Sequence, residues 1–185
     1  SHPLDPAGAV GMNYYCQAVN YSGGSLVSFF NKNTGARVAR FRLESLASSA
    51  PCTNGWCDPI ILYDWQANRW ILTEFDTAGS GLCIYVSQTS NPISGGWYAY
   101  FFATPCQPDY PKYGTWPTDA DGGQGSFVVT SNEPIGGSND PRVYALDRGA
   151  MLSGAPATSQ RFWDIPALSG YNFQGIAIPA DCDGD

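Results

Sequence analysis

Short segments in which apolar or aromatic residues alternate with polar ones run along almost the whole chain. This period of two is typical of β-strands that bury one face. The longest such segment is "VGMNYYCQAV", predicted here as one strand, and turn-forming stretches such as "NTG", "TAGSG" and "NPISGG" separate the segments. Only "DRGAMLSG" has the pattern of a helix, about one turn long, ending at Gly154. The pattern predicts an all-β protein with one short helix.

The predicted strands fall into repeated units. Asp5-Pro6, Asp58-Pro59 and Asp109-Tyr110-Pro111 each open a unit, at spacings of 53 and 51 residues. The second unit has four clear strands, "IILYD", "RWILTEF", "LCIYVSQ" and "WYAYFF". Four antiparallel strands repeated about every fifty residues are typical of β-propeller blades.

We therefore predict a single propeller region over residues 1–185. Its blades are expected at 5–57, 58–108 and 109–168, with the start of a fourth at 169–185. About three and a half blades do not close a ring, because blade faces need neighbours. The expected partner is the remaining set of blades or another chain.

Composition agrees with this fold class and narrows the function. Charged residues make up only 14% of the chain, while 21 glycines and 14 prolines provide turns. The net charge is −7, with only 9 lysines and arginines, which argues against nucleic acid and against an anionic membrane surface as partners. No apolar run is long enough to cross a bilayer, so we expect no membrane insertion.

Six cysteines without a CxxC pair favour disulfides in an oxidising compartment over zinc sites. The spacing favours a small loop clasp, a link within one repeat, and a link between the first and last units. The preferred pairs are Cys52–Cys57, Cys83–Cys106 and Cys16–Cys182. Sequence leaves this connectivity open, and buried free thiols are the alternative.

Five segments follow one another along the chain: "DPIILYDWQANRW", "VSQTSNPISGGWYAY", "PDYPKYGTWP", "YALDRGAMLSG" and "IPADCDGD". In this order they resemble a family of secreted bacterial β-propeller regions, found in large and largely uncharacterised multidomain extracellular proteins. The resemblance covers nearly the whole chain but only the N-terminal half of such a region. It implies a secreted or cell-surface location and supplies no catalytic residues. The inserted "TDADGGQG" after Pro117 departs from the family pattern.

Catalytic constellations are missing from the sequence. A nucleophilic triad needs a histidine base, and the only histidine is His2, beside the first residue; no GxSxG motif is present. Paired carboxylates of a glycosidase are available in principle. However, the aspartates recur at turn positions, as Asp58 and Asp64 do, which favours a role in fixing turns. We predict no catalytic residues, and whether the chain is an enzyme stays open at this point, with the residues leaning against it.

Two acidic, glycine-containing segments suggest calcium as a cofactor. "DCDGD" alternates Asp181, Asp183 and Asp185 with other residues, as the start of an EF-hand loop does. "TDADGG" places Asp119 and Asp121 at a similar spacing. The alternative is that both are solvated acidic loops.

Aromatic residues beside loop-like sequence are candidates for stacking on sugar rings. These ligand-binding candidates are Trp56, Trp65 and Trp116, with packing as the alternative. Three further side chains at blade edges are expected to satisfy local hydrogen bonds: Tyr110, Lys112 and Arg148.

Three functions fit these observations. The favoured one is a non-catalytic extracellular module that recognises a glycan or a cell-surface protein. The second is a carbohydrate-active enzyme, a polysaccharide lyase or glycosidase, whose acid, tyrosine and arginine residues lie partly on missing blades. The third is a structural subunit of an extracellular assembly.

Overall fold

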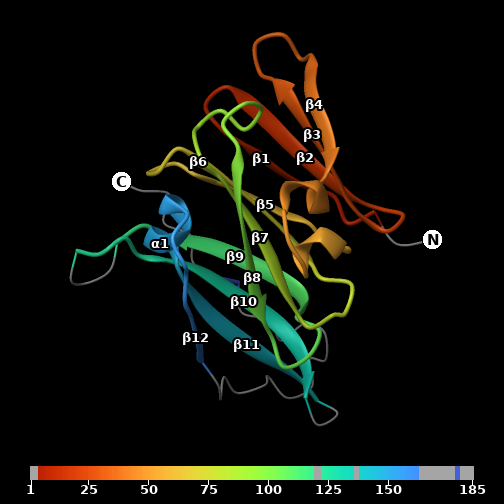
Figure 1. Cartoon of the computed structure of the whole chain (residues 1–185), viewed down its shortest axis with the longest axis vertical. Helices are drawn as coiled ribbons and strands as arrows, with labels where there is room; N and C mark the ends of the chain where they lie inside the picture. The colour runs from red at the N-terminus through yellow and green to blue at the C-terminus, as the bar shows by residue number, and fades with distance from the viewer. Residues whose placement is uncertain (1–3, 119–121, 136–137, 163–177, 180–185) are drawn as a thin grey trace.

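The computed structural model describes residues 4–118, 122–135, 138–162 and 178–179, and shows an all-β architecture as predicted. Within these ranges, every strand belongs to one of three four-stranded antiparallel sheets (Figure 1). The first sheet comprises β1 (Ala7–Val10), β2 (Tyr14–Tyr21), β3 (Gly24–Asn31) and β4 (Arg37–Arg42). The second comprises β5 (Ile60–Asp64), β6 (Arg69–Phe75), β7 (Gly81–Ser87) and β8 (Trp97–Ala103). The third comprises β9 (Asp109–Trp116), β10 (Ser126–Ile135), β11 (Ser138–Asp147) and β12 (Ser159–Phe162).

Within each sheet the strands pair in chain order, as in a β-meander. The first strands of the three sheets, β1, β5 and β9, are called the opening strands here. β1 contacts β5, and β5 contacts β9, so the opening strands lie next to one another. Each predicted unit from 5 to 168 thus contains one sheet. The predicted fourth unit, 169–185, lies outside the described residues except for positions 178 and 179.

The prediction of "VGMNYYCQAV" as one continuous strand is wrong. The chain turns after β1, where the Gly11 N–H donates to the Tyr14 carbonyl at 2.9 Å, and β2 returns antiparallel to β1. A Cβ at position 11 would lie 2.6 Å from the Trp70 ring and 2.7 Å from the Tyr63 ring. The turn therefore packs directly on aromatic rings, and only glycine leaves room for them.

Two hydrophobic cores separate the sheets. The first lies between the first and second sheets, with Phe29 and Trp70 at 5.1 Å between ring centroids. The second lies between the second and third sheets and includes Ile84 and Phe127. Every residue of β7 is buried because the second sheet has a core on both faces.

The α-helix found in the described ranges, α1 (Arg148–Ser153), forms where the sequence predicts it. The Asp147 side chain accepts a hydrogen bond from the Ala150 N–H at 2.9 Å and caps the first turn. Gly154 ends the helix with a left-handed φ of 75°. Two 3₁₀ helices, Leu43–Leu46 and Cys52–Asn54, connect the first sheet to the second.

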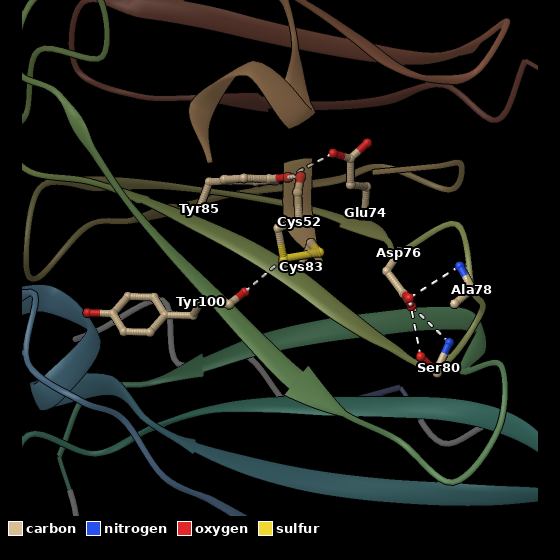
Figure 2. The surroundings of a disulfide bond; sticks show 8 residues. All are labelled: Cys52, Glu74, Asp76, Ala78, Ser80, Cys83, Tyr85 and Tyr100. Carbon is tan, nitrogen blue, oxygen red and sulfur yellow. Dashed lines mark hydrogen bonds between the residues drawn. A yellow bond between two sulfur atoms is a disulfide. The ribbon is translucent and has the colours of Figure 1, made fainter. Parts of the chain in front are cut away.

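The disulfide joins Cys52 to Cys83, so the predicted pairs Cys52–Cys57 and Cys83–Cys106 are wrong (Figure 2). Cys52 and Cys83 both lie in the core between the first and second sheets, whereas Cys57 packs on the core on the other side of the second sheet. Nearness in sequence therefore does not bring Cys52 and Cys57 together. Among the described cysteines, three carry free thiols: Cys16, Cys57 and Cys106. The predicted partner of Cys16, Cys182, lies outside the described residues.

Candidate binding pocket

A cavity of about 600 Å³ lies where the three opening strands begin. It is lined by backbone and side chains from the start of each sheet, with Ile60 and three prolines on its apolar side. Its polar lining includes Asp5, Asn20, Asp58, Gln107, Asp109, Tyr110 and Lys112. The volume lies in the range of small-molecule binding sites.

The same backbone conformation recurs at the three openings. Asp5, Asp58 and Tyr110 each precede a proline and have positive φ angles of 34°, 57° and 51°. This left-handed conformation is uncommon for residues other than glycine, although aspartate tolerates it better than most. The repeated openings therefore turn their first residues toward a common point.

Asn20, on β2, holds two of the openings together. Its Nδ2 donates to Asp5 Oδ2 at 2.9 Å and to Asp58 Oδ1 at 3.3 Å, while its Oδ1 accepts from the Asp58 N–H at 2.7 Å. Asn20 is buried, so these bonds replace water around its carboxamide. One amide thus fixes the wall of the pocket formed by the first and second sheets.

The carboxylates of the pocket repel one another. Burial raises the pKa of Asp58, the Asn20 hydrogen bond lowers it, and the nearby charges of Asp5 and Asp109 raise it further. Cys57, at the edge of the same cavity, has its pKa raised to about 12 by burial and by Asp58. The Cys57 thiol therefore stays protonated near neutral pH and is not an activated nucleophile.

Lys112 provides the one positive charge among the lining residues. Its Nζ lies 3.4 Å from the centroid of the Tyr110 ring and donates to the Pro111 carbonyl at 3.2 Å. Burial lowers the pKa of Lys112, and the charges of Asp58, Asp109 and Asp5 oppose that shift. Lys112 makes the local hydrogen bond expected of it, and both Tyr110 and Lys112 line the cavity.

Two of the predicted ligand-binding tryptophans lie at the other ends of the opening strands. Trp65 follows β5 and Trp116 ends β9, and their exposed fractions are 45% and 48%. Trp65 packs edge-on against Tyr63 at 4.8 Å between centroids. Trp56 is half-buried, and its backbone N–H donates a hydrogen bond to the Phe75 carbonyl at 2.7 Å. No tryptophan belongs to the pocket lining.

A buried ion pair supports the end that carries Trp65 and Trp116. Arg148, on α1, donates to both Asp64 oxygens, at 2.6 and 3.0 Å, and to the Pro117 carbonyl at 3.2 Å. Asp64 also accepts the Ala67 N–H at 3.0 Å, which is the turn-fixing role expected of it. Arg148 therefore fixes the backbone next to each tryptophan and joins the second sheet to the third.

The predicted calcium ligands all lie outside the described residues: Asp119, Asp121, Asp181, Asp183 and Asp185. Within the described ranges, no group of three or more histidine, cysteine or acidic side chains is arranged to hold a metal ion. Calcium binding by these segments stays a prediction.

Carboxyl and tyrosine side chains meet at two other places, both inside the sheets. Tyr85 donates to Glu74 at 2.9 Å, and burial raises the pKa of Glu74 to about 8 (Figure 2). Tyr144 donates to Glu133, whose pKa is also raised by burial. Both glutamates are almost fully buried, so neither pair reaches a ligand in the pocket.

The pocket residues can accept hydrogen bonds from hydroxyl and ammonium groups and donate from Lys112, whose ammonium group already lies against the Tyr110 ring. Sequence reasoning missed the pocket, although its signal, the recurring Asp-Pro openings, was visible. Comparisons with protein-family models, with curated proteins and with solved structures found no match to this chain. The part of the chain that the structure describes contains no helix long and apolar enough to span a membrane.

Proposed function

We propose that this protein is a non-catalytic binding module of a secreted or cell-surface protein, built from propeller-type blades, and that its pocket binds a sugar. The observation that carries the proposal is the meeting of three strand openings in one polar cavity of about 600 Å³. A site with many hydrogen-bond acceptors, one aromatic ring and no activated nucleophile suits recognition of a polyhydroxylated ligand.

The charge of the pocket indicates which sugars fit best. Asp5, Asp58 and Asp109 carry three negative charges against the single positive charge of Lys112. An amino sugar would offset this excess, a neutral sugar would leave it unchanged, and a uronic acid would increase it. We expect affinity to fall in the order amino sugar, neutral sugar, uronic acid.

The fold and the cysteines support the remaining parts of the proposal. Adjacent opening strands with meander sheets around them are the arrangement expected of propeller blades, whose remaining members would be further blades or another chain. The Cys52–Cys83 disulfide is compatible with an oxidising, extracellular location.

Calorimetric titration with the methyl glycosides of glucosamine, glucose and glucuronic acid tests the proposal. In Asp58→Asn, glucosaminide affinity should fall roughly tenfold, because a charge-assisted hydrogen bond is lost. Asp147→Asn is the matched control: it removes the same charge at the cap of α1, where asparagine caps equally well. Tighter binding of the glucuronide, or an equal loss in both variants, would refute the proposal.

A further inference from the structure

The positive charge of this protein is concentrated in its first sheet. Arg37, Arg40 and Arg42 lie on β4 and Lys32 in the turn before it, and no aspartate or glutamate occurs between Asp5 and Glu44. Residues 7–42 thus carry a net charge of +4 in a chain whose total is −7. A local excess of this sign in an acidic protein favours an anionic partner at that surface.

The arginines lie on the face of the first sheet that points away from the second. Cys16, Ala18, Val27 and Phe29 pack in the core between these sheets. Since side chains alternate along a strand, their neighbours occupy the opposite face. A cavity of about 280 Å³ lies on that face, lined by Gln17, Val19, Leu26, Ser28, Phe30, Arg37 and Arg40.

Two of the arginines are available to a ligand and one is not. Arg42 is paired with Glu44 and donates to the Gly23 carbonyl. Arg37 and Arg40 are exposed, and in the described ranges neither guanidinium group has a hydrogen bond or ion pair. Their guanidinium groups can each bind a carboxylate or sulfate through two parallel hydrogen bonds.

We propose that this face of the first sheet, at Arg37 and Arg40, binds an anionic polysaccharide. The carboxylate or sulfate groups pair with the two guanidinium groups, and the C–H face of a sugar ring lies on Val19 and Leu26, which follow Arg40 on the same face. The cavity is on the sheet face and not along the open edge of β4, so the ligand needs no strand pairing, which favours a sugar chain over an acidic peptide.

The site is separate from the pocket at the strand openings and shares no lining residue with it. The proposal therefore goes beyond the sugar-binding function above and does not depend on it. The two sites also differ in the sign of their net charge. The acidic pocket disfavours the anionic sugars that this basic face selects.

Biolayer interferometry with immobilised polygalacturonate, dextran and poly-L-glutamate tests the proposal on the full chain. We expect binding to polygalacturonate in about 20 mM salt, strong weakening in about 300 mM salt, and no binding to dextran, because the contact is ionic. Arg40→Gln should weaken binding several-fold and Arg37→Gln/Arg40→Gln at least about tenfold. Arg161→Gln, on β12, removes one charge elsewhere and should change nothing.

Three outcomes would overturn the proposal. The first is no binding to polygalacturonate at low salt, and the second is equal weakening by Arg40→Gln and Arg161→Gln. The third is tighter binding to poly-L-glutamate, which would assign the face to an acidic protein. Asp58→Asn should leave polygalacturonate binding unchanged, so a failed pocket and a failed basic face give different results.

Discussion

The opening strands β1, β5 and β9 have two ends of opposite chemistry. At their beginnings, carboxylates of Asp5, Asp58 and Asp109 crowd around a cavity with one lysine. At the other ends of β5 and β9 lie the exposed side chains of Trp65 and Trp116. Next to them, Arg148 and Asp64 form a buried ion pair. We call these the pocket end and the aromatic end.

This difference indicates that the aromatic end contributes to stability and the pocket end to ligand recognition. At the aromatic end the buried charges are paired with each other and with backbone groups, so little is left for a ligand. At the pocket end, burial and then the nearby charges of Asp5 and Asp109 raise the pKa of Asp58, and the Asn20 hydrogen bond offsets only part of this shift. Uncompensated groups of this kind are typical of functional sites.

The largest effect is expected at the aromatic end, from Arg148→Met. This change leaves the Asp64 carboxylate buried without its partner and should lower the free energy of unfolding by about 3–5 kcal/mol. Urea denaturation measures it, and Asp64→Asn/Arg148→Met should recover part of the loss. A loss below about 1 kcal/mol would show that the ion pair does not hold this end together.

The next largest effect on the free energy of unfolding is expected from Glu74, a buried carboxyl between the two ends, and it should depend on pH. Folding raises the pKa of Glu74 from 4.5 to about 8, so its stabilising contribution is complete below pH 4.5 and is lost as the pH rises toward 8. In Glu74→Gln that loss should disappear, a difference of up to about 4 kcal/mol at pH 8. Parallel stability curves for the two proteins from pH 5 to 8 would contradict the burial of an ionisable Glu74.

Asn20→Leu should destabilise the pocket end by about 2 kcal/mol. The Asp58 N–H loses its acceptor, and the Asp5 and Asp58 carboxylates lose the amide between them. Thermal unfolding measures the change, with Gln17→Leu, an exposed position on the same strand, as the control. Equal effects of the two substitutions would mean that the Asn20 bridge adds nothing to stability.

Asp58→Asn should change stability in the opposite direction, because it should stabilise the folded protein. Because folding raises the pKa of Asp58, its ionised form disfavours the folded state as the pH rises through that pKa, and removing the charge should slightly stabilise the protein at pH 7. The same variant should lose glycoside affinity. Destabilisation together with unchanged affinity would make Asp58 a structural residue like Asp64.

The smallest effect is expected from Trp116→Ala. Trp116 is half-exposed, so the change in unfolding free energy should stay within about 0.5 kcal/mol, and glycoside affinity should not change. Calorimetry on this variant compares the two ends directly. A strong loss of glycoside affinity would move the binding site to the aromatic end.

Local patterns in the sequence predicted much of the fold. Alternation located most of the strands, Asp147 and Gly154 marked the ends of α1, and Asp58 and Asp109 marked the openings of two sheets. Each of these signals depends on neighbours in the chain. The pattern did not predict the break after β1, because Gly11 is required by the Tyr63 and Trp70 rings, which are distant in sequence.

The pocket and the disulfide depend on how the sheets pack together, which the sequence pattern does not contain. The Asp-Pro openings were recognised as turns, but their meeting with Asn20 and Lys112 follows from β1 lying beside β5 and β5 beside β9. Similarly, Cys52 pairs with Cys83 because both face one core.

The most direct test of the pocket end as the binding site is an NMR titration of the ¹⁵N-labelled protein with methyl glucosaminide. The account predicts shifts in the backbone amides of Asp58, Tyr110 and Lys112 and in the side-chain amide of Asn20, while the indole N–H signals of Trp65 and Trp116 stay in place. Shifts of the two indole signals with unchanged pocket amides would contradict it.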